Sequence, residues 1–128
     1  MANPYRLLII DDNKVILGTY NKFFTKKKYK VFIASNGLDG LKVIASEKKG
    51  IDLVITDVVM PNISGVGVIS IIKQKYPDIP VIAITGWGNH PEALASEAAA
   101  DLVLGKPIDL TKLDREIINL ISEKKGKN

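Results

Sequence analysis

Five polar side chains of this sequence could act together on a phosphate group. Asp11 and Asp12 follow one short apolar run, and Asp57 follows another. Thr85 ends a third run, and Lys106 comes shortly after a fourth. Carboxylates that are brought together repel one another, so a hard cation is needed to keep them all ionised. Magnesium fits this set best, because it accepts a few carboxylates, keeps several waters and often binds a phosphate oxygen.

The charges of the set balance when one magnesium ion is added. Asp11, Asp12 and Asp57 contribute three negative charges, and Lys106 with the metal contributes three positive ones. Such a site can receive a phosphoryl group without prohibitive repulsion, whereas the metal-free site would repel it. Thr85 could donate its hydroxyl to a phosphoryl oxygen. Calcium is an alternative metal, but it prefers more oxygen ligands than this set supplies.

Five apolar runs predict the strands that position these residues. They lie at residues 7–10, 31–34, 53–56, 81–85 and 102–104. Because they are mostly continuous Val, Ile and Leu, they are typical of strands buried on both faces. Strands that alternate with helices pair in parallel through right-handed crossovers. We therefore expect an α/β fold, a (βα)5 flavodoxin-like three-layer sandwich with strand order 2-1-3-4-5.

Helical periodicity between the runs predicts five helices. They are residues 14–27, a segment after Asn36, a segment capped by Ser64, residues 92–100 with Pro91 beside the first turn, and a last helix capped by Asp109. The apolar face expected for the first helix is Ile16, Tyr20, Phe23 and Phe24, and that for the second is Leu38, Leu41 and Ala45. The third helix is expected to bury Val68, Ile69 and Ile72. The last helix is expected to bury Leu110, Leu113, Ile117, Leu120 and Ile121.

The predicted topology brings the polar residues to one edge of the sheet. In such folds, ligands bind beyond the carboxyl ends of the strands where the winding direction switches, here at strands 1 and 3. Each residue also has an ordinary interpretation: Asp12 could cap the first helix, Asp57 could be a turn residue, and Thr85 could donate to a backbone carbonyl. Their convergence at one edge favours the functional interpretation. His90, the only histidine, is interpreted as a loop or capping residue.

Length and composition fit one globular domain. The chain has 128 residues, of which 46% are hydrophobic and 25% charged. We expect a single domain over residues 1–128, with a core at about 5–122 and a polar tail at 123–128. Cysteine is absent, which excludes disulfides, thiolate nucleophiles and cysteine-bound metals and fits a reducing compartment. There is no signal-peptide pattern and no run near the roughly 20 apolar residues of a membrane helix, so a soluble, cytoplasmic protein is predicted.

Lysine clusters account for the formal net charge of +4. They lie at residues 26–28, 48–49 and 124–125, near predicted helix ends where cations complement the helix dipole. No arginine lies in these clusters, and we do not expect a base-stacking platform beside them. We interpret them as a solvated surface and expect no direct contact with nucleic acid and none with a membrane.

Four motifs together resemble the receiver domain of two-component response regulators. They are the acidic pair Asp11-Asp12, the stretch 57–65, Thr85 with the glycine after it, and the Lys106-Pro107 pair. The resemblance covers about residues 5–122, and the four motifs occur in the family's order, which makes the combination specific. Any one of them alone would be weak.

The resemblance implies a function for each motif. Asp57 would attack the phosphorus of a phosphohistidine on a sensor histidine kinase or a histidine phosphotransfer protein and become an aspartyl phosphate. Magnesium would be bound by Asp12, Asp57 and the backbone carbonyl of Val59, with Asp11 acting through a water. Thr85 and Lys106 would hold the phosphoryl oxygens, and the peptide before Pro107 is expected to be cis.

The same resemblance implies a phosphoacceptor switch rather than an enzyme. Movement of Thr85 toward the phosphate would shift an equilibrium between two conformations, and the fourth helix, fifth strand and fifth helix would signal to a protein target. The usual aromatic residue three positions before the lysine is replaced by Val103. Trp87 is expected to cover part of the site, and Val59 offers no polar group to orient water, so slow hydrolysis of the aspartyl phosphate is predicted.

Three other protein classes were weighed against this one. A dinucleotide or flavin enzyme needs a Gly-rich turn after strand 1, where Asp11 and Asp12 lie instead. A phosphatase of the haloacid dehalogenase type needs Asp-x-Asp after strand 1 and a larger cap region. A pseudo-receiver that only binds partners is disfavoured by the full acidic set. We expect a single-domain regulator, with an excised receiver of a larger regulator or hybrid kinase left open.

Overall fold

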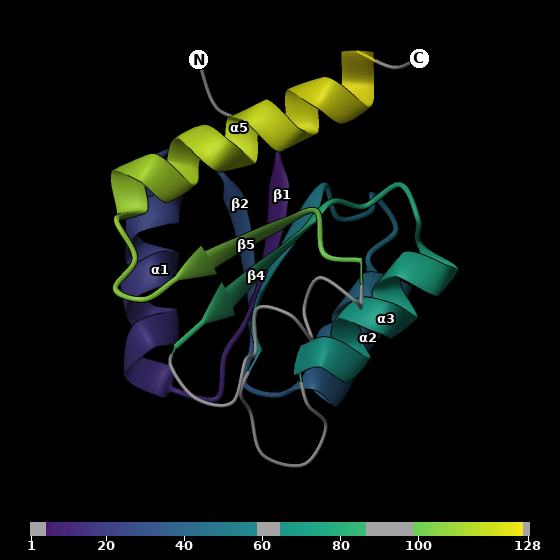
Figure 1. Ribbon diagram of the computed structural model, residues 1–128, viewed down its shortest axis with the longest axis horizontal. Helices are drawn as coiled ribbons and strands as arrows, with labels where there is room; N and C mark the ends of the chain where they lie inside the picture. Colours follow the sequence, from purple (N-terminus) through teal and green to yellow (C-terminus); the bar gives the residue numbers. More distant parts are fainter. Residues whose placement is uncertain (1–4, 59–64, 87–98, 127–128) are drawn as a thin grey trace.

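A five-stranded parallel sheet forms the centre of the computed structural model, which describes residues 5–58, 65–86 and 99–126. The strands are β1 (Arg6–Ile10), β2 (Lys30–Ala34), β3 (Leu53–Asp57), β4 (Val81–Thr85) and β5 (Leu102–Gly105). Their spatial order is β2-β1-β3-β4-β5, and every neighbouring pair is parallel (Figure 1). The predicted fold and strand order are confirmed.

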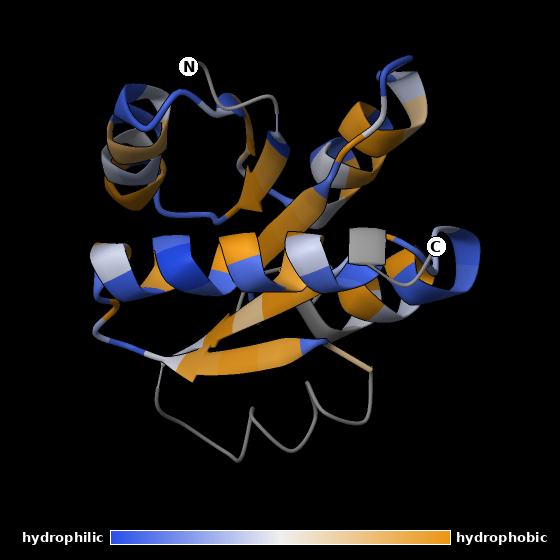
Figure 2. Cartoon of the chain, turned by 90° about the horizontal axis from the view of Figure 1, so that it is seen from above, coloured by the Kyte–Doolittle hydropathy of each residue, from blue (hydrophilic) through white to orange (hydrophobic). Residues whose placement is uncertain are grey.

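Helices cover both faces of the sheet. The described helices are α1 (Lys14–Lys26), α2 (Gly37–Ser46), α3 (Gly65–Lys75) and α5 (Leu110–Gly126). Side chains of α1 and α5 pack with one face of the sheet, and those of α2 and α3 pack with the other. Figure 2 shows the strands between them as almost entirely hydrophobic. No helix in the described part of the chain is both long and apolar enough to span a membrane.

Burial follows position within the sheet. β3 and β4 are buried throughout and β1 over all but its first residue, as the continuous apolar runs predict. The expectation of full burial is wrong for the two edge strands. Only Ala34 of β2 is buried, and no residue of β5 is. An edge strand has a neighbour on one side only, so the helices cover it less completely.

Most of the predicted helix faces are confirmed. The buried members of those faces are Tyr20 and Phe24 in α1, Val68, Ile69 and Ile72 in α3, and Leu113, Ile117 and Ile121 in α5. Asp109 caps α5 as predicted, because its Oδ1 accepts hydrogen bonds from the backbone N–H groups of Thr111 and Lys112. Ser64 and Pro91 lie outside the described residues.

The face predicted for α2 is confirmed only for Leu41, which is partly buried and packs against the core. Leu38 is 52% exposed and Ala45 is exposed, whereas Gly37, Gly40 and Ile44 are buried. A Cβ at Gly40 would lie 2.4 Å from Ile10 Cδ1, so the glycine allows a close approach of the helix to β1 that a larger residue could keep only if Ile10 moved. The close approach of this glycine face turns Leu38 away from the sheet.

Two predicted ends also differ from the structure. The fourth helix was expected at 92–100, of which 92–98 lie outside the described residues, but Ala99 is in a turn with φ 70° and Ala100 is not helical. Helix α5 continues to Gly126, so most of the expected polar tail at 123–128 is helical. No helix-breaking residue precedes Gly126 in this segment, and the polar side chains favour helix as readily as a loop.

Candidate phosphoacceptor site

The three predicted carboxylates meet at the carboxyl edge of the sheet. Asp57 is the last residue of β3, and Asp11 and Asp12 follow the neighbouring β1. One ligand oxygen of each lies within 4.8 Å of the others. Asp11 and Asp57 are 2% and 5% exposed, whereas Asp12 is exposed. The cluster is therefore open on the Asp12 side and enclosed by the sheet on the other.

The alternative interpretation of Asp12 as a helix cap is wrong. Asn13 caps α1, because its Oδ1 accepts hydrogen bonds from the N–H groups of Val15 and Ile16 at 3.0 and 3.1 Å. Asp11 in turn accepts a hydrogen bond from the N–H of Asn13 at 2.8 Å. Asp12 therefore has no part in capping the helix and can face the cluster.

Electrostatics in the cluster favour an added cation. Burial raises the pKa of Asp11, and the negative charges of Asp57 and Asp12 raise it further. The hydrogen bond from Asn13 and the charge of Lys106 lower that pKa but do not compensate fully. Three carboxylates offer only hard oxygen ligands, which are the ligands that magnesium prefers. The residues present therefore fit a magnesium ion.

Lys106 brings a positive charge to the same edge. It follows β5, and its Nζ lies 3.4 Å from Asp57 Oδ2, with 32% of the lysine side chain exposed. Its backbone N–H donates to the carbonyl of Thr85 at 2.7 Å, which fixes the loop against β4. The peptide before Pro107 is cis, as expected. A separation of 3.4 Å is long for a charged hydrogen bond, so the contact between Lys106 and Asp57 is a loose one.

Thr85 lies at the same edge, but its hydroxyl makes the ordinary contact that the sequence left open. It is the last residue of β4 and is 1% exposed. Its Oγ1 donates to the carbonyl of Leu104 at 3.5 Å, which is the outer limit for a hydrogen bond. This weak bond is one that a stronger acceptor could replace. Val59, Trp87 and His90 lie outside the described residues.

Sequence reasoning missed one neighbour of the cluster, Tyr20. It was expected only on the apolar face of α1, where it is indeed buried. Burial and the nearby negative charges of Asp11 and Asp57 raise its pKa to about 12. Tyr20 and Lys106 also line one cavity of about 500 Å³ between α1 and the loop after β5. A hydroxyl on an otherwise apolar helix face was the signal that could have found it.

The chain belongs to a known family of signalling domains. The model of the response regulator receiver domain matches residues 7–118, and this match shows that the chain is a member of that family. The fold, the strand order and the acidic cluster all agree with this assignment.

Named relatives and solved structures give the same result. The receiver domain protein from Clostridium thermocellum has a TM-score of 0.89 and 33% identity, covering 97% of this chain and 99% of its own. The response regulator TrrA from Thermotoga maritima, solved in complex with Mg2+ and BeF, has a TM-score of 0.81 and 31% identity, covering 91% and 98%.

Relatives found by sequence are longer proteins. The transcriptional regulatory protein GlrR of Escherichia coli (strain K12) is 32% identical over 121 residues, which is 94% of this chain. The match covers only 27% of GlrR. The similarity therefore concerns the receiver domain, and the name of the relative describes the whole of that longer protein.

Proposed function

We propose that Asp57 is the phosphoacceptor of this receiver domain. The observation that carries the proposal is the position of its carboxylate, which is buried at the end of a central strand. One oxygen each of Asp11 and Asp12 lies within 4.8 Å, and Lys106 Nζ lies at 3.4 Å. A carboxylate nucleophile that lies in an acidic, metal-binding cluster and has a cation beside it suits attack on phosphorus.

The chemistry is a transfer of one phosphoryl group. An oxygen of Asp57 forms a bond to phosphorus, the P–N bond of a phosphohistidine breaks, and its electron pair stays on the donor's imidazole. Lys106 would offset the charge that builds up on the phosphoryl oxygens, and Thr85 would exchange its weak bond to a carbonyl for one to phosphate. Magnesium, held by Asp11, Asp12, Asp57 and the carbonyl of Val59, would neutralise the remaining charge.

Support for the metal comes from the acidic cluster and from the solved relative TrrA, which was determined with Mg2+ and BeF. In this proposal the donor is a sensor histidine kinase or a histidine phosphotransfer protein. The chain acts as a phosphoacceptor switch that helps its own phosphorylation and dephosphorylation. Its output surface would include β5, α5 and the expected fourth helix at 92–100. Residues 92–98 of that segment lie outside the described residues.

The other classes are less well supported. A pseudo-receiver would not need the close grouping of Asp11, Asp12, Asp57 and Lys106. A phosphatase of the haloacid dehalogenase type is disfavoured because the chain belongs to the receiver family. The single-domain organisation, the cytoplasmic location and the absence of nucleic-acid and membrane contacts stay predictions.

Phosphorylation by a small donor tests the central claim. The protein is incubated with acetyl phosphate and magnesium, and its intact mass is measured. We expect a phosphoryl adduct on the wild type. The adduct should not form when a metal chelator is present during the incubation, and it should be absent from Asp57→Asn. Asp78→Asn, at an exposed carboxylate outside the cluster, is the matched control and should behave as the wild type. An equal adduct on Asp57→Asn would refute the proposal.

A further inference from the structure

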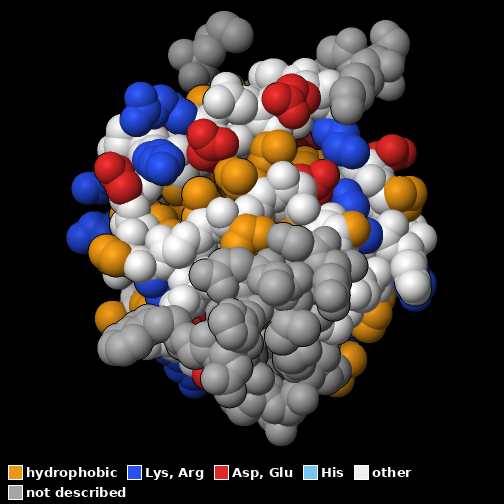
Figure 3. Space-filling model, viewed as in Figure 1, with side chains coloured by type: hydrophobic (Ala, Val, Ile, Leu, Met, Phe, Trp, Pro, Cys, Tyr) orange, Lys and Arg blue, Asp and Glu red, His pale blue; other side chains and the backbone are white. Residues whose placement is uncertain are grey.

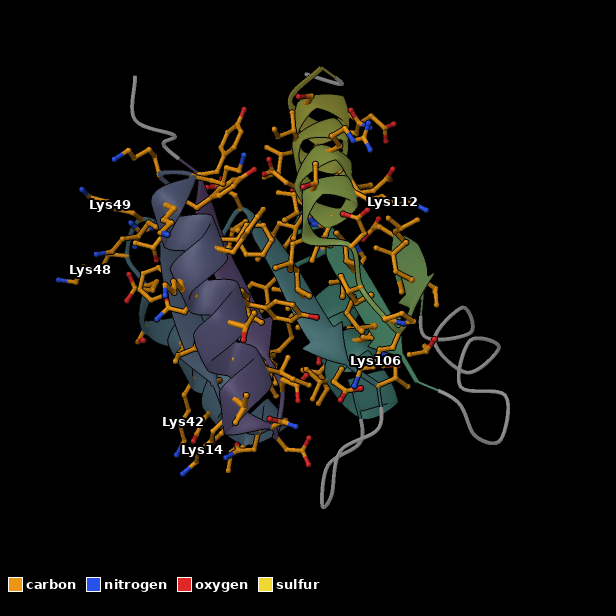
Figure 4. All side chains as sticks on the ribbon, turned by 90° about the vertical axis from the view of Figure 1, so that its left-hand side faces the viewer. Lys14, Lys42, Lys48, Lys49, Lys106 and Lys112 are labelled. Carbon is orange, nitrogen blue, oxygen red and sulfur yellow. The ribbon has the colours of Figure 1, made fainter. Side chains whose placement is uncertain are left out.

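Helix α1 is bordered by a second groove, on its side toward β2 and α2. The first cavity involves Tyr20 and Lys106, as described above. The second, of about 390 Å³, lies between α1 and the β2–α2 connection and includes Lys14, Gly18, Ile33 and Asp39 in its lining. We call it the β2-edge groove. Figure 4 shows Lys14 on the opposite side of α1 from Lys106.

Exposed apolar side chains gather on the elements that form this groove. Val15 of α1 is 78% exposed, Ile33 of β2 is 44% exposed and Leu38 of α2 is 52% exposed. Only two other large hydrophobic residues of the described part are exposed, Ile71 and Ile118. Ile33 lines the groove itself, whereas Val15 and Leu38 are the sequence neighbours of the lining residues Lys14 and Asp39. Single exposed apolar residues are ordinary, but exposed apolar residues that gather near a groove are typical of an interaction site.

Gly18 keeps the groove open at a cost to the helix. Glycine in the interior of a helix is less favourable than alanine. No packing in the described structure requires it, because a Cβ at Gly18 would meet no heavy atom within 4 Å. The contrast with Gly40, where a Cβ would lie 2.4 Å from Ile10, is clear. The missing side chain at Gly18 instead leaves room beside Ile33 for an incoming group.

The groove lies in the basic part of the protein. Residues 1–50 contain ten Lys and Arg but four Asp and Glu, whereas the other residues contain eight and ten. Lys14, Lys22 and Lys26 are exposed and recur at multiples of four residues with Gly18 along α1, and Lys42 is exposed on α2. Figure 4 places Lys14, Lys42, Lys48 and Lys49 on one side of the molecule, and in Figure 3 several Lys and Arg side chains line the left border.

The one acidic residue in the groove lining has a local explanation. The N–H of Asp39 donates to Asn36 Oδ1 at 2.8 Å, and Asn36 Nδ2 donates to Asp39 Oδ2 at 3.0 Å. This pair caps the start of α2, where a carboxylate also complements the helix dipole. The carboxylate of Asp39 is therefore hydrogen-bonded within its own helix, and the basic character of this surface comes from the exposed lysines on α1 and α2 around the groove.

We propose that the β2-edge groove docks an acidic, amphipathic segment of a partner protein. Apolar side chains of the segment enter over Gly18 and Ile33, and its carboxylates face Lys14, Lys22 and Lys42. A second copy of this chain would bring an equally basic surface, and like charges disfavour that pairing. A lipid surface is too broad to place side chains in a groove of this size. The interaction uses no residue of the phosphoryl chemistry and goes beyond the proposed function.

Binding of a designed peptide tests the proposal. The probe is a synthetic amphipathic helix of about 15 residues with Leu on one face and Glu elsewhere, labelled for fluorescence anisotropy. Gly18→Leu fills the groove without changing charge, and Lys14→Glu with Lys22→Glu reverses its rim. The matched control is Lys75→Glu with Lys112→Glu, which makes the same charge change at exposed lysines of α3 and α5. Circular dichroism checks that every variant is folded.

The expected result separates groove binding from general charge attraction. Gly18→Leu and the rim double variant should each weaken the peptide at least about tenfold, while the control double variant changes it by less than about twofold. Equal weakening by both double variants, or unchanged binding to Gly18→Leu, would overturn the proposal. The proposal would also be overturned if the peptide did not bind and the groove had another occupant. That result would be binding of anionic vesicles, binding of duplex DNA or self-association of the free protein, in each case lost in Gly18→Leu.

Discussion

Replacing Gly18 by alanine should stabilise the protein, whereas the same change at Gly40 should give no gain or destabilise it. Both glycines lie in the second turn of a helix that is capped by asparagine, so the gain in helix propensity is similar. Their surroundings differ. A Cβ at Gly40 would lie 2.4 Å from Ile10 Cδ1 and 2.8 Å from Cγ1, and a Cβ at Gly18 would meet nothing within 4 Å.

The magnitudes follow from these contacts. Glycine to alanine within a helix contributes about 1 kcal/mol to stability, so Gly18→Ala should gain roughly that amount. At Gly40 the added methyl group meets a side chain that is 1% exposed and cannot turn into solvent. Overpacking costs about 1–3 kcal/mol, which outweighs or cancels the helix gain. The two variants should therefore differ by about 1–3 kcal/mol in the free energy of unfolding.

Urea unfolding followed by far-ultraviolet circular dichroism measures this difference, with m-values checked for equality. Each kcal/mol corresponds to roughly 4 °C in Tm for a chain of this size, so thermal melts give a second reading. Because Ile10 precedes Asp11, Gly40→Ala should also reduce the stabilisation that magnesium provides. If Gly40→Ala proved as stable as Gly18→Ala, the close approach of α2 to β1 would be refuted.

Asn13→Ala should cost about 1 kcal/mol in urea unfolding because it removes the cap of α1, whereas Asp12→Ala should not lower the metal-free stability. Burial and neighbouring charges raise the pKa of Asp11, so the folded state holds this proton more tightly than the unfolded state. Metal-free stability should fall as pH rises from the ordinary value of 3.8 through the raised one, and Asp11→Asn should lose this dependence in urea titrations at several pH values. Trp87→Ala with Val59→Asn should speed loss of the phosphoryl adduct in timed mass spectra, and unchanged decay would contradict the predicted shielding.

Several elements could be predicted because one physical cause dominates each. β3 and β4 lie in the middle of the sheet with helices on both sides, so their sequences must be continuously apolar. The same argument failed for β2, since a sheet edge is covered less completely than its centre and the sequence does not mark the edges. Asp109 was predicted correctly as the cap of α5. At α1, Asp12 and Asn13 are adjacent and equally suitable as caps, and only the path of the backbone places Asn13 at the cap position.

Side-chain arrangement was less predictable than element type. The apolar pattern of α2 indicated a face with Leu38, but a glycine face that permits close contact with Ile10 was buried instead. Tyr20 was expected as an apolar core residue, and its proximity to Asp11 and Asp57 emerged from the packing of α1 against the sheet. Both outcomes depend on distances between elements that are far apart in the sequence.

By itself, the sequence determined the order of strands and helices and the edge at which Asp11, Asp12, Asp57, Thr85 and Lys106 meet. Local periodicity and the handedness of parallel crossovers are enough for that. The tertiary structure decided the distances: the ligand oxygens of the three carboxylates lie within 4.8 Å of one another, Lys106 Nζ lies 3.4 Å from Asp57, and Thr85 makes a weak bond to a carbonyl. These distances depend on how closely the helices pack and on where each loop turns. Both are determined by the side-chain volumes of the whole core together.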